Sequence, residues 1–139
     1  MFKMKIYFAG AIRGGREKVN DYAKIVSKLQ EFGDVLTVHV ANPELCDKGE
    51  LNMSMEDIYN RDIDWLKQAD LVIAEVTVPS LGVGYELGMA ERLGKKVICF
   101  FDNKSSSHLS AMIGGDKYFD IYNYEKIDDI LDILDKKLN

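Results

Sequence analysis

The chain has 139 residues, of which 47% are hydrophobic, and its 18 basic and 23 acidic side chains give a net charge of −5. A chain of this size forms one domain with a substantial core, and its acidic balance argues against tight binding to polymeric nucleic acid, which requires a broad basic face. The charge leaves room for a small anionic ligand held by a local pocket.

The cysteines and the apolar stretches of the sequence indicate where in the cell the protein is expected. Cys99 lies in an apolar run and is expected to be a small buried side chain, whereas Cys46 lies in a polar segment, so no disulfide framework is predicted. No signal sequence precedes the first apolar run, and no apolar stretch approaches the ~20 residues of a membrane span. The sequence therefore predicts a cytoplasmic protein that does not enter a membrane.

Apolar runs alternate with helical patterns along the whole chain, and polar or glycine-containing segments separate them. In chain order the predicted elements are strand Lys5–Gly10, helix Arg16–Phe32, strand Val35–Val40, loop Ala41–Met53, helix Ser54–Gln68, strand Leu71–Val76, loop Thr77–Gly82, helix Val83–Leu93, strand Lys96–Phe101, segment Asn103–Gly115 with room for one helical turn, strand Tyr118–Tyr122 and helix Glu125–Leu138.

Strands that alternate with helices imply a parallel sheet covered on both faces. The predicted fold is a single α/β domain over residues 1–139, a three-layer sandwich with a mostly parallel five-stranded sheet of the Rossmann-like or flavodoxin-like type. Such sheets bind ligands at the carboxyl ends of their strands. Residues that follow the strands are therefore the first candidates for a site.

Asp62 lies on the apolar stripe of the predicted helix Ser54–Gln68, four residues after Ile58 and three before Trp65, whereas Asp64 lies off the stripe. An acidic side chain on a buried face is costly unless it is paired or used in chemistry. An ion pair with a neighbouring side chain and a catalytic role both explain Asp62.

Glu86 shows the same anomaly in the next predicted helix, where it shares a face with Met89 and Ala90. It also lies in the first predicted turn, where unpaired backbone N–H groups favour an ionised carboxylate. An ordinary Glu that stabilises its helix accounts for this position, and so does a nucleophile kept charged at a ligand-binding strand end. Together with Asp62 it fits a glycosidase pair, in which one acid attacks the anomeric carbon and the other assists the leaving group.

The first predicted strand runs into the glycine segment, residues 10–16 (GAIRGGR). Its three glycines let backbone N–H groups approach an anion, and the helix that follows adds positive potential. Arg13 offers a forked pair of donors to a phosphate. The segment is either a phosphate-binding loop or a plain strand-to-helix turn with exposed arginines.

Two other kinds of site are disfavoured. Residues 82–88 (GVGYELG) come close to a dinucleotide-binding fingerprint, but the spacing is one residue too long and Glu86 would face the pyrophosphate where the motif needs bare N–H groups. His39 and His108 have no metal-like spacing with other candidate ligands, so no metal site is predicted.

Four segments taken together resemble a known family. They are residues 7–16 (YFAGAIRGGR), 61–66 (RDIDWL), 74–77 (AEVT) with 79–88 (PSLGVGYELG), and 109–113 (LSAMI). This combination is similar to the 2′-deoxynucleoside 5′-monophosphate N-glycosidases, a branch of the nucleoside 2-deoxyribosyltransferase superfamily, and the match runs almost from end to end.

The resemblance implies a homodimer of Rossmann-like subunits. Glu86 would be the nucleophile, Asp62 would assist departure of the base, and Tyr7 would lie beside both acids. Ser110 would reach the phosphate in the site of the other subunit. Ala11 stands where close relatives often have serine, so a side-chain hydroxyl toward the phosphate is missing here.

The resemblance also implies which residues bind the substrate. The glycine segment and Ser80 would hold the phosphate, and Met112 and Ile58 would form walls for the base. The full set is Gly10, Ile12, Arg13, Gly14, Gly15, Ser80, Gly82, Ser110, Met112 and Ile58.

The activity implied is hydrolysis of the N-glycosidic bond to free base and 2-deoxyribose 5-phosphate, through a glycosyl-enzyme on Glu86 and without a metal or organic cofactor. Three alternatives remain open. A nucleoside 2-deoxyribosyltransferase would pass the sugar to a second base, and a ribonucleotide N-glycosidase acting on CMP would differ only toward the 2′-OH. A non-catalytic nucleotide-binding module would not need both acids on buried faces.

Overall fold

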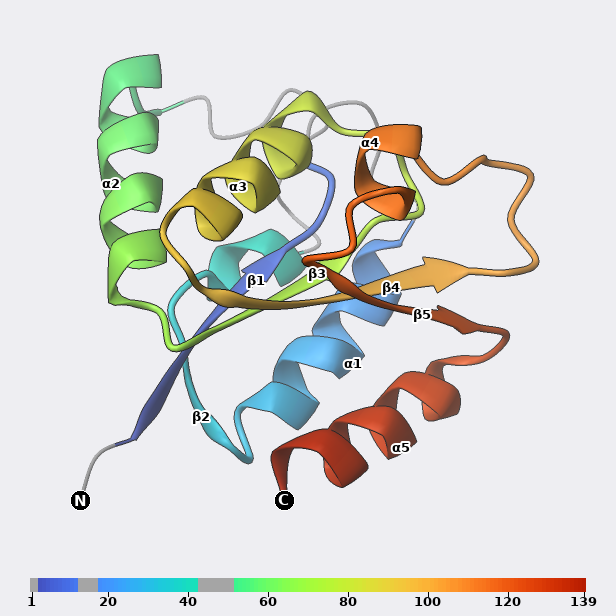
Figure 1. Ribbon diagram of the computed structural model, residues 1–139. Coiled ribbons are helices and arrows are strands. Elements are labelled where there is room, and N and C mark those ends of the chain that lie inside the picture. The colour runs from blue at the N-terminus through green and yellow to red at the C-terminus, as the bar shows by residue number, and fades with distance from the viewer. Residues whose placement is uncertain (1–2, 13–17, 43–51) are drawn as a thin grey trace.

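The computed structural model describes residues 3–12, 18–42 and 52–139. Within these residues the strands form one parallel five-stranded sheet in the order β2-β1-β3-β4-β5, the flavodoxin-like order. The predicted α/β fold is confirmed (Figure 1). The elements are β1 (Met4–Ala9), α1 (Val19–Leu29), β2 (Gly33–Val35), the 3₁₀ helix η1 (Val38–Ala41), α2 (Met55–Gln68), β3 (Leu71–Glu75), α3 (Leu81–Arg92), β4 (Lys96–Asp102), α4 (Ala111–Gly114), β5 (Asp120–Tyr124) and α5 (Ile127–Leu138).

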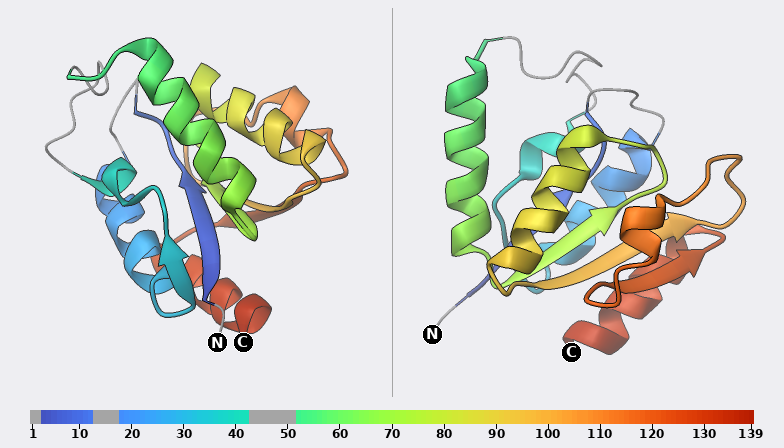
Figure 2. Two further views of the ribbon diagram at one scale, coloured as in Figure 1. Left: turned by 90° about the vertical axis from the view of Figure 1, so that its left-hand side faces the viewer. Right: turned by 45° about the horizontal axis from the view of Figure 1, so that its top comes forward.

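Alternate residues of the strands feed two hydrophobic cores, one on each face of the sheet. On one face Ile6 and Phe8 of β1 pack with α1 and α5, which contribute buried residues such as Leu134. On the other face Tyr7 packs with α2 and α3, which contribute buried residues such as Leu87. Figures 1 and 2 show the two helical layers on either side of the sheet. The two-residue period of the strands thus produces the three-layer sandwich.

Serine caps set where the two site-bearing helices begin. The Ser54 hydroxyl accepts a hydrogen bond from the Asp57 N–H at 3.0 Å, which confirms the predicted cap of α2. The Ser80 hydroxyl accepts from the Val83 N–H at 3.2 Å. Because Ser80 is the cap, α3 begins at Leu81, two residues before the predicted start.

The predicted strand Val35–Val40 is wrong beyond its first residue. The strand β2 ends at Val35, and the chain then turns into η1. Thr37 ends the strand pairing because its buried side chain takes the place of a backbone partner of β1. The Thr37 hydroxyl accepts from the Phe8 N–H at 2.8 Å and donates to the Phe8 carbonyl at 2.7 Å.

The last strand begins two residues later than predicted, at Asp120. Tyr118 is held in a turn before it, because its N–H donates to the Asp116 carboxylate at 3.0 Å and its hydroxyl donates to the Lys95 carbonyl at 2.6 Å. The helical turn expected within 103–115 is present as α4. Within the residues described, no helix is both long enough and apolar enough to span a bilayer.

We expect Thr37→Val to lower the free energy of unfolding by at least about 2 kcal/mol, because the N–H and C=O of Phe8 both lose a buried partner. Thr37→Ser is the matched control: it keeps the hydroxyl and should cost roughly 1 kcal/mol for the lost methyl group. Urea denaturation measures both variants. Equal losses would show that the hydroxyl does not hold the end of the strand.

Candidate active site

A cavity of about 640 Å³ lies at the carboxyl end of β1, between η1, α2 and the start of α3. Its volume falls in the range of pockets that enclose small organic ligands. Eight of the side chains and glycines expected at the site line it, namely Tyr7, Gly10, Ile12, Ile58, Asp62, Ser80, Gly82 and Glu86. Segments far apart in the sequence therefore meet here, as the family resemblance implied.

The other expected residues lie elsewhere. Arg13, Gly14 and Gly15 fall outside the described residues. Ser110 and Met112 do not line the cavity of their own chain. Both are exposed at the start of α4, which lies on the opposite side of α3 from α2 (Figure 1).

Glu86 meets Tyr7 at the cavity wall. Tyr7 is buried on β1, and its hydroxyl donates a hydrogen bond to Glu86 Oε2. Because burial and the negative charge of Glu86 raise the pKa of Tyr7 well above its usual value, Tyr7 keeps its proton and remains a donor.

Burial dominates the protonation of Glu86. It raises the pKa of this carboxyl to about 7, against the lowering effect of the hydrogen bond from Tyr7 and with a smaller raising effect from the charge of Asp62. The expected placement of Glu86 in the first turn of its helix is wrong. Since α3 begins at Leu81, Glu86 lies in the second turn, beyond the unpaired N–H groups.

Asp62 lies on α2 and pairs with the residue beside it. Arg61 donates from Nε to Asp62 Oδ1 at 2.9 Å, and its Nη2 is also 2.9 Å from that oxygen. The guanidinium of Arg61 stacks on Trp65, with 4.8 Å between the charge centre and the ring centroid. The ion pair foreseen for Asp62 is therefore present, and Asp62 still lines the same cavity as Glu86. Both acids thus line one cavity, and a catalytic role for the pair stays a prediction.

Four further side chains that carry hydrogen-bonding groups line the cavity and were not anticipated from the sequence: Thr37, His39, Tyr59 and Tyr85. Thr37 and His39 follow the carboxyl end of β2, but the strand predicted over Val35–Val40 concealed that position. The Tyr59 and Tyr85 hydroxyls approach each other to 3.4 Å, joining α2 to α3 at the cavity. Tyr59 and Tyr85 directly follow or precede Ile58 and Glu86 in the sequence, and this adjacency to two expected site residues was the signal that could have indicated them.

The arrangement suits substitution at an electrophilic carbon. A half-buried carboxyl that titrates near neutrality can attack an electrophilic carbon, and a second carboxylate nearby can assist a leaving group. Among the described residues, no group of three His, Cys, Asp or Glu side chains is placed to hold a metal ion.

The sequences of several known proteins match nearly the whole chain. The sequence model of the nucleoside 2-deoxyribosyltransferase family matches residues 6–125. A 5-hydroxymethyl-dUMP N-hydrolase of Tetraodon nigroviridis is 55% identical over 113 residues, covering 81% of this chain and 80% of the relative. The protein of the same name from Danio rerio is 47% identical over 136 residues, covering 96% and 94%. The one from Homo sapiens is 50% identical over 125 residues, covering 87% and 72%.

Solved structures share the fold. The CMP N-glycosidase of Clostridium botulinum superposes with a TM-score of 0.70 at 24% identity, over 96% of this chain and 99% of that one. A 2-desoxiribosyltransferase from Leishmania mexicana superposes with a TM-score of 0.58 at 19% identity, over 96% and 98%. The family match and the structural neighbours agree with the observed fold. The chain belongs to the nucleoside 2-deoxyribosyltransferase family.

Proposed function

We propose that the protein hydrolyses the N-glycosidic bond of 2′-deoxynucleoside 5′-monophosphates, releasing the free base and 2-deoxyribose 5-phosphate. The observation that carries this proposal is that Glu86, Tyr7 and Asp62 line one cavity of nucleotide size. Relatives at 47% to 55% identity are named 5-hydroxymethyl-dUMP N-hydrolase. We therefore take 5-hydroxymethyl-dUMP as the first substrate to test.

In the proposed mechanism the ionised carboxylate of Glu86 attacks C1′ of the sugar. The C1′–N bond breaks as the C1′–O bond forms, its electron pair leaves with the base nitrogen, and Asp62 relays a proton from solvent to the departing base. Tyr7 donates to Glu86 Oε2 and so orients the carboxylate for attack through its other oxygen. Water then attacks C1′ of the glycosyl-enzyme and gives up a proton, which Asp62 passes to solvent. The C1′–O bond to Glu86 breaks and frees the carboxylate, so that the configuration at C1′ is retained.

Ser80 is proposed to donate to the substrate phosphate together with the glycine segment and Arg13. Its hydroxyl oxygen already accepts from the Val83 N–H, which leaves the hydroxyl proton to donate into the cavity that Ser80 lines. Ala11 is fully buried and offers no such proton. In this chain the phosphate therefore depends more on backbone N–H groups than it would with serine at this position.

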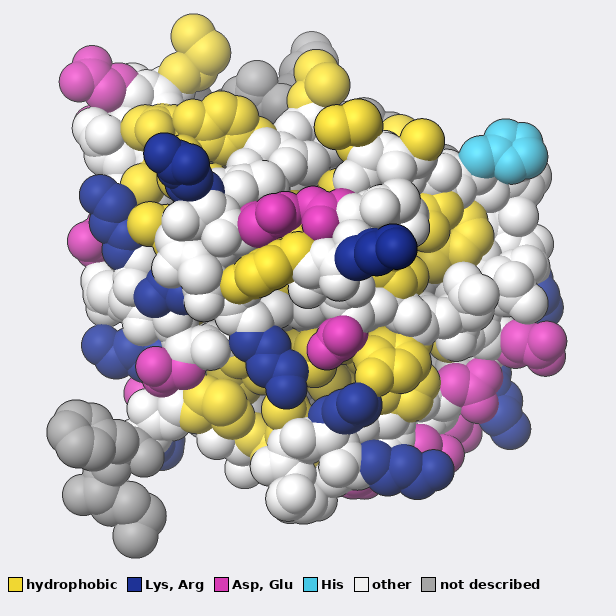
Figure 3. All heavy atoms as spheres, viewed as in Figure 1, with side chains coloured by type: hydrophobic (Ala, Val, Ile, Leu, Met, Phe, Trp, Pro, Cys, Tyr) yellow, Lys and Arg dark blue, Asp and Glu magenta, His cyan; other side chains and the backbone are white. Residues whose placement is uncertain are grey.

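A homodimer with Ser110 in the site of the other subunit is also part of the proposal. Leu81 is 97% exposed and Met112 is 81% exposed, although both are large apolar residues. Met55 and Tyr85 are exposed as well. Figure 3 shows hydrophobic side chains along the upper part of the face formed by α2, α3 and α4. An apolar face of this kind is typical of a surface that another chain covers, and it carries Ser110 at its edge.

A cytoplasmic location belongs to the same proposal. Cys99 is a buried free thiol, a state that reducing compartments preserve. Cell fractionation followed by detection with an antibody checks the location.

The first prediction concerns substrate and nucleophile. We expect base release from 5-hydroxymethyl-dUMP and other deoxynucleoside monophosphates but much less from the matching nucleosides, because the phosphate supplies positioning energy. Glu86→Gln should lose activity by on the order of 10³-fold or more. Glu91→Gln, on the same helix and not lining the cavity, is the matched control and should keep full activity. Chromatography of the released base measures both.

Two outcomes of that assay would contradict the proposal. Equal rates on a nucleoside and its monophosphate would remove the role of the phosphate. Release that requires a second base in the mixture would identify a deoxyribosyltransferase.

The pH dependence follows from the pKa of Glu86. The nucleophile must be ionised, so kcat/KM should rise with pH through about 7 and level off above it. Tyr7→Phe removes the hydrogen bond that lowers this pKa, so the rising limb should move to higher pH. A pH–rate profile of both proteins measures the shift. A rising limb centred below pH 5, or a downward shift in Tyr7→Phe, would show that the environment assigned to Glu86 is incorrect.

A mixing experiment tests whether the site is shared between subunits. Glu86→Ala should be inactive, and Ser110→Ala should lose roughly 10- to 100-fold for one hydrogen bond to a charged group. A mixed dimer has one intact site and one doubly defective site, so complete subunit exchange should restore roughly a quarter of wild-type activity. Tagged subunits verify the exchange. Verified mixed dimers no more active than Ser110→Ala alone would place Ser110 in its own chain's site, or outside any site.

A further inference from the structure

Arg61 lies on α2 next to the cavity residue Asp62, but it does not line the cavity itself. Its guanidinium contacts two residues that do. Nε donates to Asp62 Oδ1 at 2.9 Å, and Nη2 is also 2.9 Å from that oxygen. Nη2 lies 3.3 Å from Nε2 of His39 as well. Arg61 therefore connects cavity residues of two separate elements, α2 and η1.

Further contacts fix the orientation of this guanidinium. It stacks on the Trp65 ring, with 4.8 Å between the charge centre and the ring centroid, and Nη1 donates to Met53 Sδ at 3.2 Å. The His39 ring also packs beside Trp65, with 5.7 Å between the centroids. The Arg61 side chain is only 22% exposed. Because a planar fork held on several sides cannot turn freely, Arg61 places its charge and its donors at fixed points.

The contact with Arg61 determines the protonation of His39. A guanidinium carries only N–H donors and stays charged at every pH at which proteins are folded. Nε2 of His39 must therefore accept from Nη2 of Arg61, which places the ring proton on Nδ1. A proton on Nε2 would set two donors against each other and bring a second positive charge beside the first. Arg61 thus favours a neutral His39 ring in one tautomer.

The charge of Arg61 also reaches the two acids of the cavity. Asp62 and Glu86 line the same cavity, and two ionised carboxylates so placed repel each other. Beyond the dominant effect of burial, the charge of Asp62 raises the pKa of Glu86, whereas the charge of Arg61 lowers it. Among the described residues, the other titratable groups on the cavity wall are Tyr7 on β1, His39 on η1, Tyr59 on α2 and Tyr85 on α3.

We propose that Arg61 is a positioning residue of the active site, which acts through Asp62 and His39 and not on the substrate. It holds the Asp62 carboxylate and the neutral His39 ring in place on the cavity wall. Its charge offsets that of Asp62, so that Glu86 can ionise in the same cavity. The inference rests on the proposed function, because it takes Glu86 as a nucleophile. Groups that react are effective only when neighbours with fixed geometry hold them.

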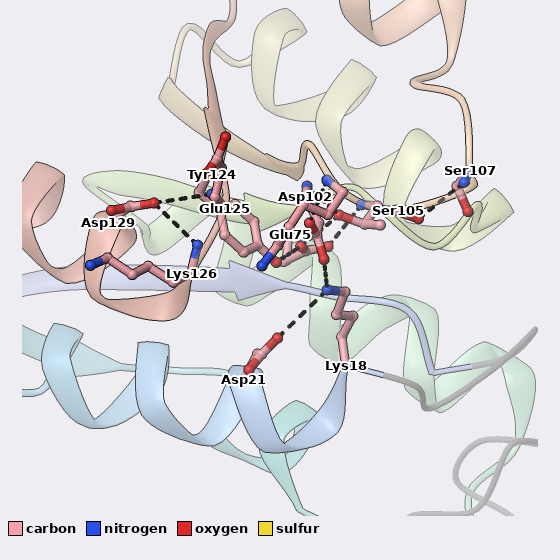
Figure 4. Close-up of polar contacts among 12 residues, drawn as sticks. Lys18, Asp21, Glu75, Asp102, Ser105, Ser107, Tyr124, Glu125, Lys126 and Asp129 are labelled. Atoms are coloured by element: carbon pink, nitrogen blue, oxygen red, sulfur yellow. Dashed lines mark hydrogen bonds and ion pairs between the residues drawn. The ribbon is translucent and has the colours of Figure 1, made fainter.

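A second largely buried cation shows that ion pairing by itself does not concern the site. Figure 4 shows Lys18 beside Asp102 and Asp21, with Glu75 nearby. The Lys18 ammonium donates to Asp102 Oδ2 and lies 3.7 Å from Asp21 Oδ2. None of these four residues lines the cavity. Arg61 differs because two of its partners do.

Lys28 on α1 supplies a matched control. Its side chain is 15% exposed, and it pairs with Glu31 at 3.3 Å and with Asp135 at 2.7 Å. It also lies over the Phe32 ring, 5.7 Å from the centroid. Neither Lys28 nor these partners line the cavity. Lys28→Gln therefore loses the same kinds of contact as Arg61→Gln, a carboxylate pair and an aromatic ring, and reports any effect that comes from stability alone.

The first measurement needs no substrate. The sequence has two histidines, and His108 is exposed, so it serves as an internal reference in an NMR titration of the ring signals. In the wild type, ring nitrogen shifts should show the His39 proton on Nδ1. In Arg61→Gln the midpoint of the His39 titration should rise by on the order of one pH unit, because a neighbouring positive charge is gone. Arg61→Lys should restore part of the difference, and Lys28→Gln should leave the midpoint unchanged.

The second measurement is the pH–rate profile for 5-hydroxymethyl-dUMP. In Arg61→Gln the rising limb of kcat/KM should move to higher pH, because the charge of Asp62 is no longer offset near Glu86. The plateau kcat should fall by on the order of 10-fold with a smaller change in KM, since Arg61 does not line the cavity. Arg61→Lys should keep the limb near its wild-type position, and Lys28→Gln should match the wild type. Thermal melting records the stability of each variant.

The outcomes separate this inference from the proposed function. A wild-type His39 ring protonated on Nε2 at neutral pH overturns the inference without any variant. So does an unchanged His39 midpoint in Arg61→Gln, an equal shift in Lys28→Gln, or a wild-type pH–rate profile in an active Arg61→Gln. A wild type that cleaves no nucleotide but shows the expected His39 tautomer and the Arg61-dependent midpoint contradicts the proposed activity while supporting the placement of His39 by Arg61.

Discussion

The Glu86 carboxyl is held largely out of water between α3 and β1, with the Tyr7 hydroxyl as a hydrogen-bond donor on one of its oxygens. Desolvation and this hydrogen bond act in opposite directions, and together they bring the pKa of Glu86 to about 7, where both protonation states are populated near neutral pH. The sheet makes the contact possible, because Tyr7 points to the α3 side only through the alternation of β1.

Two buried acids in this fold illustrate different uses of a carboxylate. Both oxygens of Glu75 accept hydrogen bonds from the protein, so that side chain serves to connect segments. Glu86 instead faces a cavity large enough for a nucleotide, and the contact with Tyr7 orients it there. Burial raises the pKa of both groups. The difference in their partners, and not the burial itself, separates the structural acid Glu75 from Glu86, the acid that is proposed to react.

The carboxyl ends of the strands bring these features together. The cavity lies where β1 ends, and the buried Glu75 lies at the end of the neighbouring strand β3. The segments assigned to the phosphate leave from the ends of β1 and β3, which are adjacent strands. A flavodoxin-like strand order thus places the cavity that Glu86 lines next to the segments assigned to the phosphate in the proposal.

The sequence by itself determined the α/β class, the parallel sheet and the apolar helix faces on which Asp62 and Glu86 stand out. It did so because burial of alternate strand residues, and of one stripe along each helix, leaves a periodic pattern of apolar residues in the sequence. Contacts between distant segments leave no such pattern. Thr37 ends β2 by bonding to Phe8, and Glu75 sits unremarked inside an apolar strand, because both depend on partners far along the chain. Only the tertiary structure decided these contacts, the position of His39 at the cavity and the true start of α3, and only the burial it imposes raises the pKa of Glu86 to about 7.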